Sequence, residues 1–430
     1  MSSFPAPALN AGSLLFVLPL LLLAPLAVAG LTLVNAGLGR SRSAAQSVLG
    51  SVVLVSVAAL VFALVGATFA DGWAGTGHIF GIGGKPWNWA GTGPIALSGF
   101  AGEPLRPQLA VLFEFLALAL AVLIPWGSGA DRWRTAAGAA SAAVLAAIVF
   151  PLYAHWVWGG GWLAQLGQNF SLGAGFLDVG GAASIHVLGG FSALTVVWIT
   201  GSRRGKFPKE GLSTAMPGHN AVYILFGCLV ALVGWLAMNM AGALLWLGAI
   251  PSALPVTALN TMLAAAGAVT ATYAVTLIRF GKPDASLCAN GWLGGLVTSS
   301  ACASLVTPVA AIFIGIVAGI GVPLAVEALE LAASIDDPSG AISVHAVGGL
   351  WGLIAAGLFA PQAGQLLAQL VGIAALLGLI LPVTYGLFAA LNRVVPFRVD
   401  PDGERIGMDL HELGGGAYPE FVVHRDDSYR

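Results

Sequence analysis

The chain has 430 residues, of which 58% are hydrophobic and only 8% are charged, and its mean hydropathy is +0.89. Soluble domains carry about 25% charged residues, so this composition excludes a soluble binding module and indicates an integral membrane protein. A formal net charge of -2, with the arginines scattered among loops, gives no basic surface for nucleic acid.

Apolar stretches of about 20 residues, the length that crosses a bilayer as a helix, recur along the chain. Eleven such stretches lie at residues 13–36, 47–69, 107–126, 134–153, 182–200, 217–240, 256–279, 285–305, 307–327, 343–360 and 366–392. Only the Thr307-Pro308 break divides the eighth from the ninth. We therefore expect an all-α integral membrane protein, with eleven transmembrane helices in one domain over residues 1–392.

The first stretch contains Ala27-Val28-Ala29, which has the small residues of a signal-peptide cleavage site. No lysine or arginine precedes Leu14, however, and the apolar run is longer than that of a typical signal peptide. We therefore favour an uncleaved first helix over a processed N-terminus.

The basic residues lie almost entirely in alternate loops. With an external N-terminus, only Lys85 and Arg106 of the 17 basic residues would be external. The cytoplasmic loops and the tail would hold Arg40, Arg42, Arg132, Arg134, Arg203, Arg204, Lys206, Lys209, Arg279, Lys282, Arg393, Arg398, Arg405, Arg425 and Arg430. This asymmetry predicts that the N-terminus is outside and the C-terminus inside.

A ten-residue phrase occurs twice, as GAASIHVLGG at Gly181–Gly190 and as GAISVHAVGG at Gly340–Gly349. Each copy lies near one end of a predicted helix and centres on a histidine, His186 or His345. Ionisable side chains are rare inside transmembrane segments, where a charged one costs at least about 2.5 kcal/mol. The matched histidines therefore indicate a pathway for a small solute.

The two copies would lie in antiparallel helices, since the fifth and tenth spans run in opposite directions. Residues 13–200 and 217–360 then form a 5+5 inverted repeat about a pseudo-twofold axis, with 366–392 as one extra helix. Such repeats place a transport site at their interface, where His186 and His345 would face each other. Small residues allow close helix packing. The glycines that flank the two histidines are Gly189, Gly190, Gly348 and Gly349.

Several motifs together resemble the Amt/Mep/Rh superfamily of ammonium transporters, and within it the bacterial Amt branch. They are AHWVWGGGW at Ala154–Trp162, Asp178-Val179-Gly180-Gly181 with His186, Asn290-Gly291, Thr307-Pro308, Asp336-Asp337-Pro338 with His345, and Gly407-Met408-Asp409 through His411 and Gly414 to Ala417-Tyr418. The resemblance implies a homotrimer in a bacterial plasma (inner) membrane, multi-pass, with a narrow pore and a twin-histidine pair in each protomer.

The resemblance also implies a mechanism in which ammonium is recruited outside, loses its proton and crosses as ammonia. A bare ammonium ion in a dry channel pays a Born cost on the order of 20 kcal/mol, whereas neutral ammonia crosses apolar walls far more easily. Histidine titrates near neutrality and has two ring nitrogens, so His186 and His345 would relay the proton. Either ring alone would have a packing role as the simpler interpretation.

Trp158, by resemblance, is the indole that attracts the cation at the external mouth through its aromatic face. An interfacial belt tryptophan is the simpler alternative. Asp178 resembles the buried acidic residue that shapes the recruitment site, although helix capping alone also explains an aspartate just before a helix start.

The chain departs from the family pattern at the mouth. By an ungapped count, the positions of the two gating phenylalanines hold Ala117 and Met238, and the position of the recruiting serine holds Gly242. Phe113 or Phe115 would refill the first gate position if the third helix shifts. No comparable substitute for the hydroxyl is visible.

Two further departures follow the resemblance. Glu114 lies inside the third predicted helix, where the family usually has glutamine, and it either receives the cation or stays protonated as a structural group. Gly340 stands where the second signature usually has another acidic residue.

Residues 393–430 form a charged, glycine-containing cytoplasmic tail without a spanning stretch. The resemblance implies docking of this tail on neighbouring protomers, coupling of the three pores, and a possible PII-type regulatory protein at the same face. The alternative is a loosely ordered, solvated end.

We expect no enzyme, no cofactor and no metal site, because the remaining histidines are scattered. They are His78, His155, His219, His411 and His424. Cys228, Cys288 and Cys302 lack metal or redox spacing and are expected to be small apolar residues. Two alternatives to ammonium transport stay open, namely a pore for another small amine or neutral gas, and an ammonium sensor with little flux.

Overall fold

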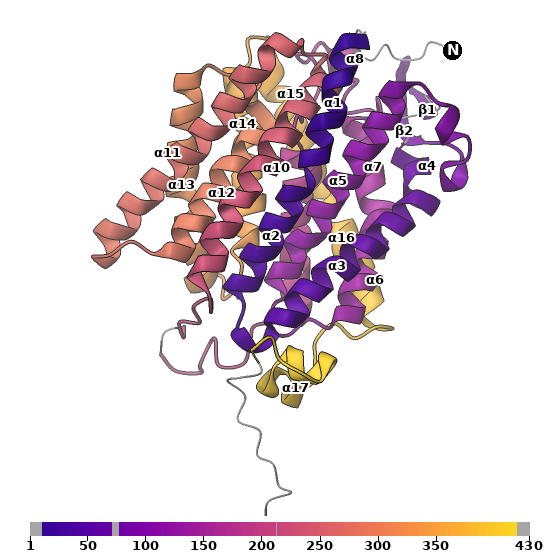
Figure 1. The fold of residues 1–430 in the computed structure, drawn as a ribbon. Helices are drawn as coiled ribbons and strands as arrows, with labels where there is room; N and C mark the ends of the chain where they lie inside the picture. Colours follow the sequence, from indigo (N-terminus) through magenta and orange to yellow (C-terminus); the bar gives the residue numbers. More distant parts are fainter. Residues whose placement is uncertain (1–10, 71–76, 212, 419–430) are drawn as a thin grey trace, which may run out of the picture.

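Long helices packed side by side make up most of the computed structural model, which describes residues 11–70, 77–211 and 213–418 (Figure 1). In chain order the helices and strands are α1 (Ala11–Leu23), α2 (Pro25–Leu38), α3 (Ala44–Val61), α4 (Ala67–Ala70), β1 (Gly77–Ile82), β2 (Lys85–Gly91), α5 (Leu105–Ser128), α6 (Thr135–Val144), α7 (Phe150–Val157), α8 (Leu166–Phe170), α9 (Leu188–Thr200), α10 (Ala221–Leu247), α11 (Leu254–Phe280), α12 (Ala285–Cys302), α13 (Pro308–Leu331), α14 (Gly348–Phe359), α15 (Gln365–Ala375), α16 (Leu381–Asn392) and α17 (Pro401–Ile406). Wider π-helical turns are η2 (Phe62–Gly66), η5 (Leu145–Val149), η6 (Ala182–Val187), η8 (Ile342–Val347), η9 (Leu376–Ile380) and η10 (Asp409–Leu413).

Within the described residues, ten helical segments are long and apolar enough to cross a membrane. They correspond to ten of the eleven predicted stretches. The remaining stretch, 285–305, is α12, an 18-residue helix that is largely buried but falls outside this apolar group. Several of its polar side chains are buried and bond to neighbouring helices: the Thr298 hydroxyl donates to the Gly348 carbonyl of α14, and the Ser299 hydroxyl accepts from Asn239 of α10.

The sixth helix differs most from its predicted range. The apolar stretch at 217–240 predicts an end near Met240, whereas α10 runs from Ala221 to Leu247. The helix continues because the segment after Met240 contains alanine and leucine, which favour helix, and it stops at Gly248, whose left-handed φ of 65° suits a C-terminal glycine. Trp246 lies in these two additional turns.

The expectation of an all-α chain is wrong in one segment. β1 and β2 form an antiparallel hairpin between α4 and α5, with register pairs that include Phe80 with Trp87. Its turn is Gly83-Gly84, with φ of 60° and 75°, the left-handed values that two-residue hairpin turns require. We call the end of the bundle that carries this hairpin the hairpin end, and the opposite end, where α17 lies, the tail end (Figure 1).

The first apolar stretch is interrupted at Pro25, which begins α2, and α2 packs against α10 at backbone contact. A side chain at Gly30 would collide with the backbone of Ala231, and one at Gly234 would collide with Ala27. The Ala27-Val28-Ala29 segment is therefore a packed part of the bundle. Residues 1–10 lie outside the described residues.

The segments that carry the two predicted histidines also meet at glycines. A Cβ at Gly190 would lie 2.5 Å from the amide nitrogen of Ala346, and one at Gly349 would lie 2.8 Å from the carbonyl oxygen of Ala182. Gly348 differs, since its nearest neighbour would be 3.5 Å away, an ordinary contact. Small residues thus let η6, α9, η8 and α14 approach one another at backbone distance.

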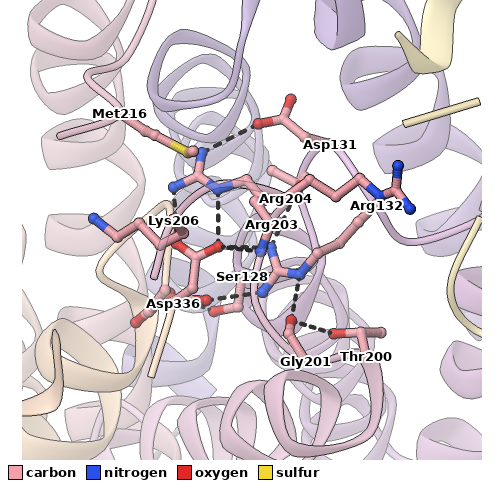
Figure 2. Close-up of polar contacts among 12 residues, drawn as sticks. Ser128, Asp131, Arg132, Thr200, Gly201, Arg203, Arg204, Lys206, Met216 and Asp336 are labelled. Carbon is pink, nitrogen blue, oxygen red and sulfur yellow. Dashed lines mark hydrogen bonds and ion pairs between the residues drawn. The ribbon is translucent and has the colours of Figure 1, made fainter. Parts of the chain in front are cut away.

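An ion network closes the tail end of the bundle (Figure 2). The Arg203 guanidinium pairs with Asp336 at 2.9 Å and with Asp131 at 3.2 Å. Arg132 donates to the carbonyl oxygens of Gly201 and Asp336, at 2.7 and 2.8 Å. All four charged side chains are nearly or fully buried, so the network joins the loops after α5, α9 and α13 away from water.

Burial and neighbouring charges shift the pKa values of this network in opposite directions. Burial by itself would raise the pKa of Asp336, but its hydrogen bonds and ion pairs with Arg203 and Arg132 lower that pKa to about 2. For Arg132, burial lowers the pKa to about 10 against the opposing influence of Asp336. Asp336 therefore stays ionised over the whole physiological range.

The described part of the tail, residues 393–418, is docked on its own protomer. The Asp409 carboxylate accepts hydrogen bonds from the amides of Ala45 and Gln46 at the start of α3, at 3.1 and 2.8 Å. Glu412 accepts from the amide of Thr135 at the start of α6, at 3.1 Å. Two tail carboxylates thus cap two long helices. The loosely ordered alternative is wrong for this part of the tail; residues 419–430 lie outside the described residues.

We expect Asp336→Asn to destabilise the protein by about 3 to 5 kcal/mol, because it leaves two buried guanidinium groups, Arg203 and Arg132, with Asp131 as the remaining carboxylate of the network. The measurement is the melting temperature of the purified protein in detergent. Since the pKa of Asp336 lies below its ordinary value of 3.8, the stabilisation is complete above about pH 4 and is lost as the pH falls toward 2. The difference between variant and wild type should shrink over that range.

The control for this substitution is Asp402→Asn, which removes an exposed pair with Arg405 at 3.4 Å. Exposed pairs contribute little, so this variant should melt with the wild type. Equal melting of the Asp336 and Asp402 variants at pH 6 would contradict the role given to the network.

We expect Gly190→Ala to lower stability by about 1 to 3 kcal/mol, the usual effect of an added methyl group in a closely packed interior. Gly348→Ala is the matched control, since its Cβ would meet ordinary contact distances and alanine favours helix. The measurement is the melting temperature of each variant, compared with that of the wild type. If Gly190→Ala is as stable as Gly348→Ala, the contact between these segments is not tight.

Candidate functional site

Two imidazole rings meet in the interior of the bundle. The Nδ1 atoms of His186 and His345 are 3.2 Å apart, and the ring centroids are 5.2 Å apart at an interplanar angle of 25°. Both side chains are almost fully buried, at 1% and 2% exposure. At this distance one ring donates and the other accepts, so the pair can share a proton along one line.

The histidines lie on π-helical turns, His186 on η6 and His345 on η8. A π turn holds one residue more than an α turn, and such turns occur often at functional sites. The repeated phrase therefore encodes the same local backbone twice. The prediction that the two rings face each other agrees with this geometry.

A tryptophan backs the pair from α10. The indole of Trp235 stacks on His186 with centroids 5.1 Å apart and an interplanar angle of 8°. Its Nε1 donates to the Ser300 hydroxyl on α12 at 3.2 Å, which fixes the ring plane. The orientation of His186 is thus set by packing on one side and by His345 on the other.

Each aspartate that precedes a histidine by eight residues caps the turn that carries it. The two carboxylate oxygens of Asp178 accept from the amides of Ala183 and Ser184, at 3.1 and 2.8 Å. Asp337 accepts from the amide of Ile342 at 2.7 Å and from the Ser128 hydroxyl at 2.6 Å. The capping interpretation of Asp178 is confirmed, and Asp337 has the same role.

The two caps are less acidic than exposed aspartates. Burial raises the pKa of Asp178 to about 6, although the hydrogen bonds from Ser184 and Ala183 oppose that rise. Burial likewise raises the pKa of Asp337, against the hydrogen bond from Ser128. The proton affinity of both groups is therefore set mainly by their low exposure to water.

Trp158 lies at the hairpin end, just after α7, and is tied to the same aspartate. Its Nε1 donates to the backbone carbonyl of Asp178 at 2.7 Å. The side-chain carboxylate of Asp178 thus accepts hydrogen bonds from the start of η6, while the backbone carbonyl of Asp178 accepts one from the Trp158 indole. One residue connects Trp158 to the turn that carries His186.

Aromatic rings surround Trp158. Phe113 of α5 makes an edge contact with it at a centroid distance of 5.2 Å, and Trp246 of α10 stacks on it at 5.4 Å and 7°. Phe113 also contacts Trp246, at 5.5 Å. We call Phe113, Trp158 and Trp246 the aromatic trio.

Only one of the two candidate replacement phenylalanines joins this trio. Phe115 instead packs against Phe62, with centroids 5.0 Å apart. Ala117 and Met238 are buried, at 0% and 2% exposure. Phe113 is thus the phenylalanine of α5 that reaches Trp158, without a shift of the helix.

Gly242 is a glycine for a steric reason. A Cβ there would collide with the carbonyl group of Val179. No serine fits at this position while Val179 stays in place. A backbone carbonyl oxygen therefore lies beside Gly242, at the position where the family resemblance led us to expect a serine hydroxyl.

Glu114 is fully buried in α5. It follows Phe113 directly, so it lies about 100° further round the helix and does not share the face that contacts Trp158. This position is one reason to test its predicted recruiting role separately from that of the trio.

Trp235 and Trp246 are functional candidates that the sequence analysis missed. Met238, Gly242 and Trp246 follow one another at intervals of four residues, and so lie on one face of α10. That spacing was a usable signal for Trp246. Trp235 had no such signal, since stacking on a histidine 49 positions away depends on how α10 packs against η6.

Metal ligands do not gather in the described part of the chain, where no three His, Cys, Asp or Glu side chains lie close enough to hold an ion. Cys228, Cys288 and Cys302 are free thiols and buried.

Comparison with known proteins gives a consistent result. The Ammonium Transporter Family matches residues 15–418. Ammonium transporter Amt2 of Archaeoglobus fulgidus is 32% identical over 418 residues, which cover 92% of this chain and 85% of that protein. An ammonium transporter of Bacillus subtilis is 29% identical, covering 96% of this chain and 99% of that protein.

Solved structures share the fold. A protein named "Sensor Amt Protein" superposes with a TM-score of 0.84 at 26% identity, covering 93% of this chain and 98% of that one. Mep2 of Candida albicans superposes with a TM-score of 0.78 at 24% identity, covering 96% of this chain and 91% of that one.

Proposed function

The chain belongs to the Ammonium Transporter Family, and from that premise we propose that it recruits ammonium, removes its proton and conducts ammonia past His186 and His345. The observation that carries this proposal is the pair of buried imidazoles with Nδ1 atoms 3.2 Å apart. A dry interior opposes passage of the cation, by a Born cost on the order of 20 kcal/mol before compensation, and favours the neutral gas. A shared proton between two rings gives the released proton a separate route.

We assign recruitment to the hairpin end, at Trp158 with Asp178 behind it. The indole face supplies cation–π attraction of about 0.5 to 2 kcal/mol. The hydrogen bond from Trp158 to the Asp178 carbonyl keeps that face in place, and the Asp178 cap fixes the backbone between the mouth and His186. The Val179 carbonyl oxygen beside Gly242 supplies an acceptor for an ammonium N–H.

The membrane arrangement belongs to the same proposal. We assign eleven spans, with α12 among them, in the 5+5 inverted repeat plus one extra helix, with the hairpin end outside and the tail end inside. The buried arginines at the tail end and the matched caps on η6 and η8 support this arrangement. We further propose a homotrimer in a bacterial plasma membrane and a PII-type partner at the tail end.

A sensor is the second candidate function. The solved structure named "Sensor Amt Protein" covers 93% of this chain, and this likeness supports a sensing role. The aromatic trio in place of the family's outer gate favours the pore for another amine. Transient currents from reconstituted protein after ammonium, methylammonium and potassium pulses separate the three. A sustained, ammonium-selective current supports transport, a sustained current larger with methylammonium supports a pore for another amine, and a brief spike supports sensing.

We expect the double substitution His186→Ala and His345→Ala to lower the ammonium-driven current by about 100-fold or more, since a positioned proton acceptor contributes at least about that factor. The measurement is the current across a supported membrane, normalised to protein density. His78→Ala is the control and should keep the full current, because His78 lies on the exposed hairpin, where its ring contacts Phe80. Full current in the double variant would remove the relay from the mechanism.

We expect Glu114→Gln to raise the half-saturating ammonium concentration about tenfold if the carboxylate receives the cation, since a charge at close range contributes at least about 1.4 kcal/mol. Glu103→Gln, just before the start of α5 and only partly buried, is the control. Unchanged half-saturation in Glu114→Gln, with unchanged melting temperature, would assign Glu114 to structure alone.

A further inference from the structure

We propose that Trp246 is a lid over the cation-binding face of Trp158, which an incoming ammonium or methylammonium ion must displace. The inference rests on the recruitment site proposed above and adds a residue to it. In this proposal the ring of Trp246 moves when the cation binds, while the ring of Trp158 stays in place.

The first argument is the geometry of the two indoles. Their planes differ by 7° and their centroids are 5.4 Å apart, so each covers the face of the other. A cation bound to an aromatic face lies within about 6 Å of the ring centroid, over the ring. The Trp246 ring lies within that distance of Trp158, and two stacked rings this close leave no room for an ion between them.

The second argument is that Trp246 is the partner of Trp158 that can leave. Phe113 and Phe150 also contact Trp158, but both are fully buried, at 0% exposure. Trp246 is only partly buried and lies in the last turn of α10 before Gly248. Of the three rings that contact Trp158, Trp246 is therefore the one with exposed surface and a place at a helix end.

The third argument is a polar atom without a partner. The indole Nε1 of Trp246 is buried and has no hydrogen-bond partner in the part of the chain that the structure describes. A buried donor left unsatisfied costs about 1 to 3 kcal/mol. In the closed position the unsatisfied Nε1 thus raises the free energy of the protein. When the indole turns outward and donates to water, this cost is removed, which lowers the free energy needed for opening.

The backbone beneath the lid is held in place. Arg106 of α5 donates through Nη2 to the carbonyl oxygen of Leu245, at 3.0 Å. This bond ties the last turn of α10 to α5, directly before Trp246. Opening is therefore a side-chain movement, and the position of Gly242 beside Val179 is kept throughout.

The test uses purified full-length protein with Trp246→Leu and Trp246→Phe. Binding is followed as the rise in melting temperature with methylammonium chloride, with sodium chloride as the salt control. Ring stacking is worth a factor of about two to ten in an equilibrium constant, so Trp246→Leu should lower the half-saturating concentration by that factor. Trp246→Phe, which keeps a smaller ring, should lie between Trp246→Leu and the wild type.

Trp198→Leu is the matched control, since Trp198 is a half-exposed tryptophan whose ring contacts Tyr385. It should leave half-saturation unchanged. In a Trp158→Leu background, the effect of Trp246→Leu should disappear, because the lid then has nothing to cover.

A raised half-saturating concentration in Trp246→Leu would overturn the lid, because it would make Trp246 a wall of the site, and an unchanged value would overturn it as well. The binding readout needs no flux. If the wild type gives no sustained ammonium current but Trp246→Leu still binds methylammonium more tightly, the transport proposal fails and the lid stands.

Discussion

Contact between two imidazole rings in an interior closed to water is the constraint on which the rest of this structure depends. Side chains alone cannot hold a 3.2 Å contact between helices that belong to distant parts of the sequence. The backbones must approach first, and glycines at positions such as Gly190 and Gly349 permit that approach. Wider π turns then direct each ring toward the other, and Trp235 fixes one ring plane.

The two ends of the bundle stabilise this centre by different chemistry. At the hairpin end, aromatic rings gather round Trp158, and the carbonyl of Asp178 connects them to the capped turn below. At the tail end, the buried ions of Arg203 and Asp336 position the loop whose next residue, Asp337, caps the second turn. Asp178 thus connects the turn of His186 to the aromatic rings at the hairpin end. Asp337 connects the turn of His345 to the ionic network at the tail end.

Much of this arrangement could be predicted from the sequence, because it depends on local sequence patterns. Ten of the apolar stretches appear as helices with membrane-spanning length, and the repeated phrase with its preceding aspartate predicts two matched histidine turns. The hairpin escaped because its strands are short and its signal is a single pair of glycines. The stack of Trp235 on His186, the carbonyl beside Gly242 and the caps from Asp409 depend on how distant segments pack, which no local pattern of the chain reports.

The tail caps have a consequence for the order of chain synthesis. A ribosome makes α3 and α6 early and reaches Asp409 and Glu412 only some 270 residues or more later, as the spans 46–409 and 135–412 show. Until then the first amides of both helices must bond to water or lipid headgroups. A chain that stops short of the tail can insert its helices but leaves those ends open, so the last contacts to form distinguish a finished chain from a truncated one.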